Sequence, residues 1–410
     1  MGRLDPGRTI AELRELKELT GDASGAQRVA WTETWRLARN WFEGKVADLG
    51  VAAETDEAGN QWVTLAGDSP EAILIGGHLD SVVNGGWLDG CLNVLAGLEV
   101  LRGIAAEGRQ SRTLRLVSWA DEEGSRFGRS LLGSSAAAGD LKPDAVRGLR
   151  DQDGEALPEA IQAFGLDVDR MGQSRRRLKD ARAYLELHIE QGPVLERLGL
   201  PLGVVLGTCG VERHSIRFTG QAAHAGSTPM DMRRDPLAAA ARLALAVRDG
   251  AKRFGGVATV GRVVTRPGIV TAVAGLCEMT LDQRHLESDE LAGMLAEARA
   301  VADAIVREEG VQVEWEEVFR IEPIHFHPGL IELCEQAVIE VAGRSHRLPS
   351  GPLHDASEVA RAGIPTAMLF VQSLNGLSHT KEEDTRPEHL ELSVRALDVA
   401  VRKALAWVDS

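Results

Sequence analysis

The chain has 410 residues, of which 44% are hydrophobic and 26% charged, and its 46 basic and 61 acidic residues give a formal net charge of −15. This length exceeds what one hydrophobic core usually covers, so we expect two domains. The negative charge opposes binding to nucleic acids and anionic membranes, and the chain shows neither a signal-peptide pattern nor an apolar run of the ~20 residues that a membrane span needs. We therefore expect a cytoplasmic protein that acts on a small molecule.

The first part of the chain predicts helices followed by an α/β sheet. Residues 8–49 have helical periodicity in two runs, and residues 93–108 predict a further helix. Five short apolar runs show no alternation, which is typical of strands buried on both faces of a mixed, mostly parallel sheet flanked by helices. These runs are residues 61–67, 72–77, 113–119, 183–189 and 366–372.

The pattern changes between residues 211 and 323, where strands and helices follow the order βαββαβ. This order is that of a ferredoxin-like α+β unit. The predicted strands are 212–220, 257–265, 274–285 and 311–319, and the predicted helices are 235–255 and 288–310. We infer an inserted second domain over 211–323, with residues 1–210 and 324–410 forming the first.

The cysteines are scattered along the chain without short paired spacing. This distribution favours reduced, buried thiols over a disulfide framework or a thiolate metal site. The four residues are Cys91, Cys209, Cys277 and Cys334.

Four segments with histidines or carboxylates stand at predicted strand ends. They are "GGHLDSVVNGGWLDG" (76–90), "ADEEGSRF" (120–127), "ELHIEQGP" (186–193) and "GLSHTKEEDT" (376–385). Ligands of open α/β sheets bind beyond the carboxyl ends of the strands, where loops gather side chains from several strands. These segments are therefore the candidate site.

His78 and Asp80 form an H-x-D pair in the first of these segments. His78 alone is as compatible with an ordinary strand-end histidine as with a ligand. A metal-bound imidazole, however, needs a carboxylate or carbonyl on its other nitrogen, which Asp80 would supply. Asp89, on a glycine-lined turn, would then bridge two ions.

Glu122 and Glu123 are adjacent acids, which in isolation most often mark a solvated turn. After a buried strand, adjacent side chains diverge, so one acid can ligate a cation while the other handles a proton. We assign Glu123 to a metal and Glu122 to proton transfer. His188 and His379 would complete five nitrogen and oxygen ligands, a set that suits a pair of Zn²⁺, Mn²⁺, Co²⁺ or Ni²⁺ ions.

These segments, together with "GQAAHAGSTPMDMRRDP" (220–236), resemble those of the M20-type amidohydrolases, which include N-carbamoyl-L-amino acid hydrolases, allantoate amidohydrolases and β-ureidopropionases. The resemblance runs from about residue 10 to 405. It implies that His78, Asp89 and His188 bind one divalent ion, that Asp89, Glu123 and His379 bind the other, and that Glu122 is the general base.

The resemblance also assigns roles outside the metal ligands. His224 matches a histidine of the smaller domain that reaches the partner subunit's active site and stabilises the oxyanion; that domain forms the dimer interface, so a homodimer and a lid function are implied. From the residues alone, His224 is equally an exposed loop imidazole. Arg284 resembles the arginine that grips the substrate carboxylate, with a surface ion pair as the alternative. Gln191 and His354 match positions that line the substrate pocket.

Three residues at positions that recognise substrate in the family depart from the family pattern. Thr271, in "PGIVTAVAG", stands where relatives carry an asparagine that contacts substrate. Pro352 and Leu353, in "GPLHDA", replace residues that leave a backbone N–H open to an anion, and proline has no N–H to offer. The hydrolytic residues are complete, whereas the residues that recognise substrate are altered.

The resemblance implies a binuclear hydrolase of linear, non-peptide C–N bonds, with an N-carbamoyl-L-amino acid, cleaved to amino acid, CO₂ and ammonia, as the best single substrate. Allantoate, a β-ureido acid, an N-acyl amino acid and a peptide are the alternatives on the same scaffold. A non-catalytic binding protein is a different class, and retention of Glu122 with all five ligands argues against it.

Overall fold

A computed structural model describes residues 4–409 of the chain. It separates into two compact units, one formed by the chain up to Leu206 together with Phe326 onward, and the other by Gly207–His325. The predicted insertion, 211–323, lies a few residues inside this division. Within residues 4–409, no helix combines the length and apolarity that crossing a bilayer requires.

The first unit is built on a mixed sheet whose strand order is β8-β18-β7-β5-β6-β4-β3, with β17 also paired to β8. The short strand β16, which extends this sheet beyond β8, lies at the boundary, within Gly207–His325. Its centre, β18-β7-β5-β6, is parallel, whereas the flanking pairs are antiparallel. The predicted run 61–67 is a strand, but it joins the sheet antiparallel to β6. The strands are β3 Ala53–Thr55, β4 Gln61–Leu65, β5 Ser69–His78, β6 Arg112–Trp119, β7 Ala181–Ile189, β8 Leu202–Thr208, β16 Ile324–His325, β17 Arg347–Ser350 and β18 Thr366–Val371.

The parallel strands are covered on both faces, which explains why their sequences do not alternate. A Cβ at Gly77 would meet Asn93 of α3 (Cys91–Glu107) at 2.9 Å, so this face of β5 lies against α3. A Cβ at Gly76 would meet the Tyr184 hydroxyl at 2.1 Å on the opposite face. That face continues to α11 (Asp355–Arg361), whose Ala356 N–H donates to Glu186 of β7.

The N-terminal segment contains two helices, in agreement with the two helical runs predicted over residues 8–49. It forms α1 (Pro6–Thr20) and α2 (Glu33–Val46), with the short paired strands β1 (Gly21–Asp22) and β2 (Gly25–Ala26) between them. The break has local causes, because Gly21 ends α1 in an extended conformation and the Thr32 side chain caps α2. Further helices of this unit are η1 Ala47–Leu49, α7 Val194–Leu198, α10 Pro328–Ala342, η4 Leu374–Gly376 and α12 Pro387–Asp409.

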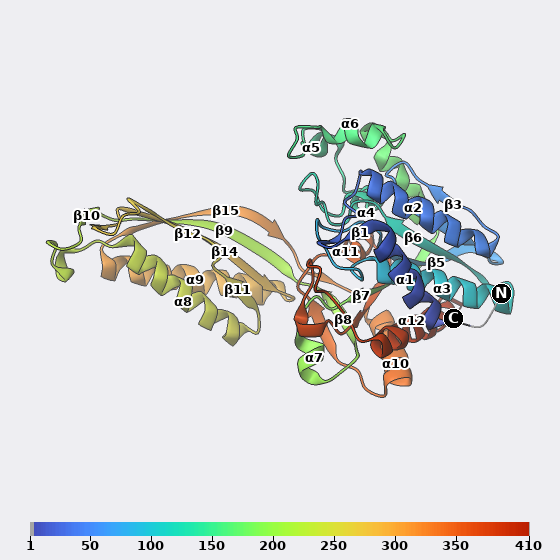
Figure 1. Cartoon of the computed structure of the whole chain (residues 1–410). Helices are drawn as coiled ribbons and strands as arrows, with labels where there is room; N and C mark the ends of the chain where they lie inside the picture. The colour runs from blue at the N-terminus through green and yellow to red at the C-terminus, as the bar shows by residue number, and fades with distance from the viewer. Residues whose placement is uncertain (1–3, 410) are drawn as a thin grey trace. The chain divides into compact units, whose positions relative to one another are not determined.

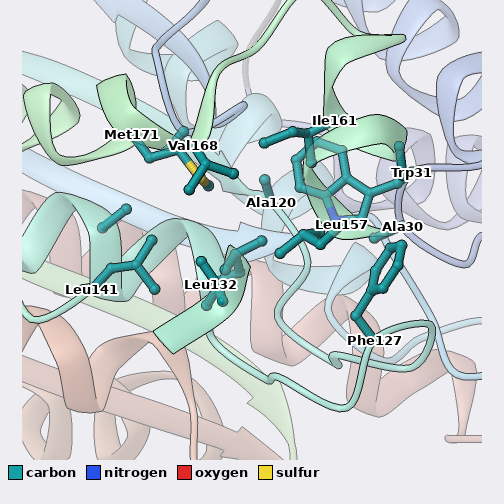
Figure 2. Close-up of a cluster of buried hydrophobic side chains, with 14 of the residues drawn as sticks. Ala30, Trp31, Ala120, Phe127, Leu132, Leu141, Leu157, Ile161, Val168 and Met171 are labelled. Atoms are coloured by element: carbon teal, nitrogen blue, oxygen red, sulfur yellow. The ribbon is translucent and has the colours of Figure 1, made fainter. Parts of the chain in front are cut away.

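A hydrophobic cluster holds the loop that follows β6 (Figure 2). It gathers side chains from α4 (Leu132–Ala138), α5 (Pro143–Arg147), α6 (Leu157–Gln162) and η2 (Val168–Leu178) around Trp31 and Ala120. The Trp31 indole N–H donates to the Asp121 carboxylate at 2.6 Å. The cluster therefore anchors residues 120–127, the segment that contains Glu122 and Glu123.

The second unit contains an antiparallel sheet in the order β11-β14-β9-β15, with β12 also paired to β14. Its elements follow the predicted βαββαβ order, and α8 and α9 pack against one face of the sheet (Figure 1). The elements are β9 Gly210–Thr219, β10 Ala223–His224, η3 Met230–Met232, α8 Pro236–Phe254, β11 Val257–Thr259, β12 Val263–Arg266, β13 Ala272–Val273, β14 Leu276–His285, α9 Ser288–Glu309 and β15 Gln312–Ile321.

The predicted strand 257–265 is two strands because of a change of register. Thr259 pairs with Asp282, whereas Val263 pairs with Met279. The edge strand therefore has one more residue than β14 over this stretch, which is the signature of a β-bulge.

Candidate metal centre

The carboxyl ends of the four parallel strands bring the predicted ligands together. His78 is the last residue of β5, and His188 lies one residue before the end of β7. Glu123 follows β6, and His379 follows β18. Parallel neighbours end at the same edge of a sheet, so residues scattered over 300 positions of sequence converge at one place.

His78, Asp89 and His188 form the first ligand group. The His78 Nε2 lies 3.5 Å from Asp89 Oδ1, and the His188 Nε2 lies 3.2 Å from the same oxygen. All three side chains are almost completely buried. One carboxylate oxygen thus faces two imidazole nitrogens.

Asp89, Glu123 and His379 form the second ligand group. The His379 Nε2 lies 3.5 Å from Asp89 Oδ2 and 3.4 Å from Glu123 Oε2. The His379 side chain is 50% exposed, so this group opens toward solvent. Asp89 belongs to both groups and presents a different oxygen to each.

Backbone carbonyls orient the two buried imidazoles. The His78 Nδ1 lies 3.1 Å from the Asp80 carbonyl oxygen, and the His188 Nδ1 lies 2.9 Å from the Ile189 carbonyl oxygen. A carbonyl only accepts, so each Nδ1 carries a proton and each Nε2 faces the ligand group. The Asp80 carboxylate has another partner, since it accepts the Glu123 backbone N–H at 3.1 Å.

Glu122 lies next to the first group without belonging to it as a close partner. Its Oε2 is 3.7 Å from His78 Nε2, and its side chain is 10% exposed. Burial, reinforced by the neighbouring Glu123, raises the pKa of Glu122 well above its ordinary value. A carboxyl with a raised pKa can take and return a proton near neutral pH.

The pKa values show how much negative charge the site concentrates. Burial, followed by the charge of Asp89, raises the pKa of Glu123 well above its ordinary value. Burial would also raise the pKa of Asp89, but the positive charge of His188 and hydrogen bonds from the surrounding histidines hold that pKa well below its usual range. Buried carboxylates that repel one another need a cation for all of them to be ionised.

The donor set fits a pair of divalent cations. Among residues 4–409, His78 Nε2 and Glu123 Oε1 are buried and have no hydrogen-bond partner, and buried polar atoms are seldom left unsatisfied. Nitrogen and carboxylate donors without thiolates suit Zn²⁺, Mn²⁺, Co²⁺ or Ni²⁺. A binuclear site whose ions share Asp89 accounts for both ligand groups at once.

Backbone conformations that side chains rarely adopt cluster at this site. Asp121, Gln191 and His379 have φ angles of 56°, 55° and 56°, in the left-handed region. Such strain persists only where the surroundings enforce it, and it is common at functional sites. Gly90 has a φ of 65°, and a Cβ there would lie 2.4 Å from the His78 ring. This is the one glycine of segment 76–90 whose absence of a side chain directly accommodates a ligand.

Two predicted substrate residues of this unit contact ligands. The Gln191 Nε2 donates to Asp89 Oδ2 at 2.8 Å. His354 is 1% exposed, and its ring centroid lies 4.5 Å from that of His188. Its Nε2 lies 2.9 Å from the Ser350 hydroxyl oxygen. In the described conformation His354 therefore supports His188.

Three predicted residues lie in the other unit. His224 is exposed, on a turn where its Nδ1 accepts the Gly226 N–H at 3.1 Å. Thr271 is also exposed, and its carbonyl accepts the Ala225 N–H at 2.9 Å, so these two segments are adjacent. Arg284 is half-buried and forms an ion pair with Asp282 at 2.8 Å.

Sequence reasoning missed the polar residues that surround the candidate ligands. Ser378 and Glu383 lie within the quoted segment 376–385 and contact the turn that contains Asp89. Tyr184 and Glu186 alternate with buried apolar residues of β7 and hydrogen-bond each other at 2.6 Å. Two features of the sequence could have identified these residues: a polar side chain within an apolar run, as in β7, and a polar side chain beside a candidate ligand histidine, as at Ser378.

Comparison with known proteins agrees with this geometry. Residues 74–403 match Peptidase family M20/M25/M40. The chain is 37% identical over 391 residues to the N-carbamoyl-L-amino acid amidohydrolase of Geobacillus stearothermophilus, with 94% of this chain and 95% of that protein covered. It is 34% identical over 394 residues to the allantoate amidohydrolase of Escherichia coli, with 94% of each covered. A hydantoinase/carbamoylase family amidase from Burkholderia ambifaria, a crystal structure, superposes with a TM-score of 0.89 at 32% identity over 98% of each chain.

Proposed function

The chain belongs to peptidase family M20/M25/M40 and, within it, to the hydantoinase/carbamoylase group of metal-dependent amidohydrolases acting on non-peptide C–N bonds, and on this premise we propose that it hydrolyses an N-carbamoyl-L-amino acid. The products would be the amino acid, CO₂ and ammonia. The observation that carries the proposal is the pair of ligand groups sharing Asp89, with Glu122 beside them.

We assign His78, Asp89 and His188 to one divalent cation and Asp89, Glu123 and His379 to the other. Bound cations would supply Lewis acidity, polarising the carbamoyl oxygen and lowering the pKa of a water molecule. Zn²⁺ is our first candidate, with Mn²⁺, Co²⁺ and Ni²⁺ as alternatives because the donor set accepts each of them.

In the proposed reaction Glu122 moves the proton. Its carboxylate accepts a proton from the attacking water as the oxygen–carbon bond forms, and it returns that proton to the nitrogen of the amino acid as the carbon–nitrogen bond breaks. The carbamate released with the amino acid then decomposes to CO₂ and ammonia. His224 would donate a hydrogen bond to the oxygen on which negative charge develops. This role assigns His224 to the active site of the partner subunit in a homodimer.

Residues outside the two ligand groups would recognise the substrate. Arg284 would exchange its ion pair with Asp282 for one with the substrate carboxylate, a bidentate contact that guanidinium groups make well. Gln191, Thr271 and His354 would line the remainder of the pocket. Thr271, Pro352 and Leu353 would alter the preferred side chain relative to other members of the group.

We further propose that residues 1–210 and 324–410 act as the catalytic domain and residues 211–323 as a dimerisation and lid domain. The βαββαβ unit is compact on its own, which suits a body that moves as one piece. Light scattering of the purified chain tests the dimer, and a monomer at all working concentrations would contradict it.

Allantoate is the second candidate substrate, because an allantoate amidohydrolase is 34% identical over nearly the same length. A panel separates the possibilities: N-carbamoyl-L-amino acids, allantoate, a β-ureido acid, N-acyl amino acids and dipeptides, each assayed with Zn²⁺, Mn²⁺, Co²⁺ or Ni²⁺ after chelation. The highest kcat/KM on a carbamoyl amino acid supports the proposal. Preference for dipeptides, or activity that survives chelation, would overturn it.

A further inference from the structure

Glu383 is a buried carboxylate that belongs to none of the ligand groups found in residues 4–409. It lies four positions after His379 and is 1% exposed. Its Oε1 accepts the backbone N–H groups of Leu88 and Asp89 at 3.1 and 3.0 Å. A carboxylate from the His379 loop thus binds the turn that presents Asp89.

The Ser378 hydroxyl links the same two acids through their side chains. Its oxygen lies 2.9 Å from Glu383 Oε2 and 3.0 Å from Asp89 Oδ2, so it can donate to either. Asp89 is therefore held at its backbone by Glu383 and at Oδ2 by Ser378. These contacts fix how the carboxylate divides its two oxygens between the ligand groups.

Gly86 shows how closely the two loops approach each other. A Cβ at this position would lie 2.0 Å from Glu383 Oε1 and 2.1 Å from its carboxyl carbon. The glutamate cannot easily move away, because it is buried and its Oε1 already accepts two backbone hydrogen bonds. Gly86 is thus required by close packing rather than by its backbone conformation.

We propose that Glu383 is a positioning residue for the metal pair, fixing the Asp89 turn against the His379 loop so that Asp89 presents one oxygen to each ligand group. The inference rests on the proposed binuclear site and adds a residue to it. Groups that orient metal ligands typically contribute 10–100-fold to metal affinity. Because Asp89 belongs to both groups, loss of Glu383 weakens binding of both ions.

The test is the affinity of the metal-free full-length chain for Zn²⁺, measured by competition with a chromophoric chelator. We expect Glu383→Ala to bind Zn²⁺ 10–100-fold more weakly than the wild type. The matched control is Glu382→Ala, since Glu382 is the exposed neighbour and its side chain accepts a hydrogen bond from the nearby Thr380. We expect the control to stay within twofold of the wild type.

Gly86→Ala breaks the same contact from the other loop and should weaken Zn²⁺ binding in the same way. In the double variant, the methyl group occupies space that the carboxylate has left, so the combined loss should be smaller than the product of the single losses. Should Glu383→Ala fail to fold, as judged by circular dichroism, the affinity of Gly86→Ala alone decides.

Three outcomes overturn the inference: unchanged affinity in folded Glu383→Ala, unchanged affinity in Gly86→Ala, or multiplicative losses in the double variant. A merely structural role would lower the unfolding temperature of the metal-free chain and leave the affinity of folded molecules unaltered. The wild type is titrated first. Fewer than two ions bound per wild-type chain would contradict the proposed metal pair itself. Two ions bound by the wild type, with unchanged Zn²⁺ affinity in the variants, would contradict only the role of Glu383.

Discussion

The strands of the mixed sheet and those of the antiparallel sheet differ in which of their residues are buried. In β7 every residue after Arg182 is buried, and the buried set includes Glu186 and His188. In β14 buried and half-buried residues alternate, and its charged side chains form ion pairs such as Arg217–Glu278 across to β9. Burial on both faces creates the low-dielectric surroundings in which histidines and carboxylates acquire unusual pKa values, whereas a sheet with one open face leaves most charges solvated.

The difference predicts where single substitutions act on catalysis and where they act on stability. The mixed-sheet unit should lose activity without unfolding when its strand-end residues are changed. The antiparallel unit should lose stability when its core is changed, and it should affect activity only through the few residues proposed to reach substrate.

Glu122→Gln should have the largest effect. Removing the proton acceptor lowers kcat by on the order of 10²–10⁴-fold, while the metal ligands remain. Steady-state kinetics and metal content by elemental analysis measure the two quantities. Glu123→Gln is the matched comparison, since it should also lose bound metal; a wild-type kcat in Glu122→Gln would remove this residue from the mechanism.

Phe218→Ala should destabilise the antiparallel unit by about 3–5 kcal/mol, because Phe218 is fully buried in the core between β9 and the two helices. Urea unfolding followed by circular dichroism gives the free energy. Phe319→Ala is the control, since Phe319 is 37% exposed and should change stability far less. Equal costs for the two would show that this core is not tightly packed.

His224→Ala should lower kcat by on the order of 10²–10³-fold and leave metal content unchanged, as expected for loss of an oxyanion donor. This would show that the antiparallel unit takes part in the chemistry as well as in assembly. His285→Ala, in the same unit, should retain activity. If His224→Ala keeps a wild-type kcat, all of the chemistry belongs to the mixed-sheet unit.

The smallest effect concerns pH. In the metal-free chain, burial and the charge of Asp80 raise the pKa of Asp121 to about 8. Burial and the charge of Asp89 raise the pKa of Glu383 to about 7. Burial would lower the pKa of His188, but Asp89 raises it to about 9.

A folded-state pKa above the unfolded value gives stability that is lost as pH rises through the folded pKa. The unfolding temperature of the chelated chain should therefore fall by roughly a few degrees between pH 7 and 9. Above pH 7 the buried His354, whose pKa is lowered by burial and by His188, is neutral in both folded and unfolded chains and adds no opposing trend. Metal-loaded protein should show a weaker dependence, and scanning fluorimetry measures both. A rise in the chelated protein would contradict the charge arrangement.

The sequence by itself determined the strand and helix types, the βαββαβ order and the segments that surround the metal centre. It did so because burial on both faces, helical periodicity and strand-end histidines are local patterns. It did not predict the antiparallel pairing of β4, the paired strands β1 and β2 between α1 and α2, or the bulge between β11 and β12, since pairing direction and register depend on other strands.

Only the tertiary structure decided which oxygen of Asp89 faces each group of candidate ligands. Asp89 presents Oδ1 to His78 and His188 and Oδ2 to His379, because β5, β7 and β18 end side by side. The same convergence places Glu383 under the Asp89 turn across nearly 300 residues of chain. No short stretch of sequence contains such a contact, because it exists only after the strands have paired.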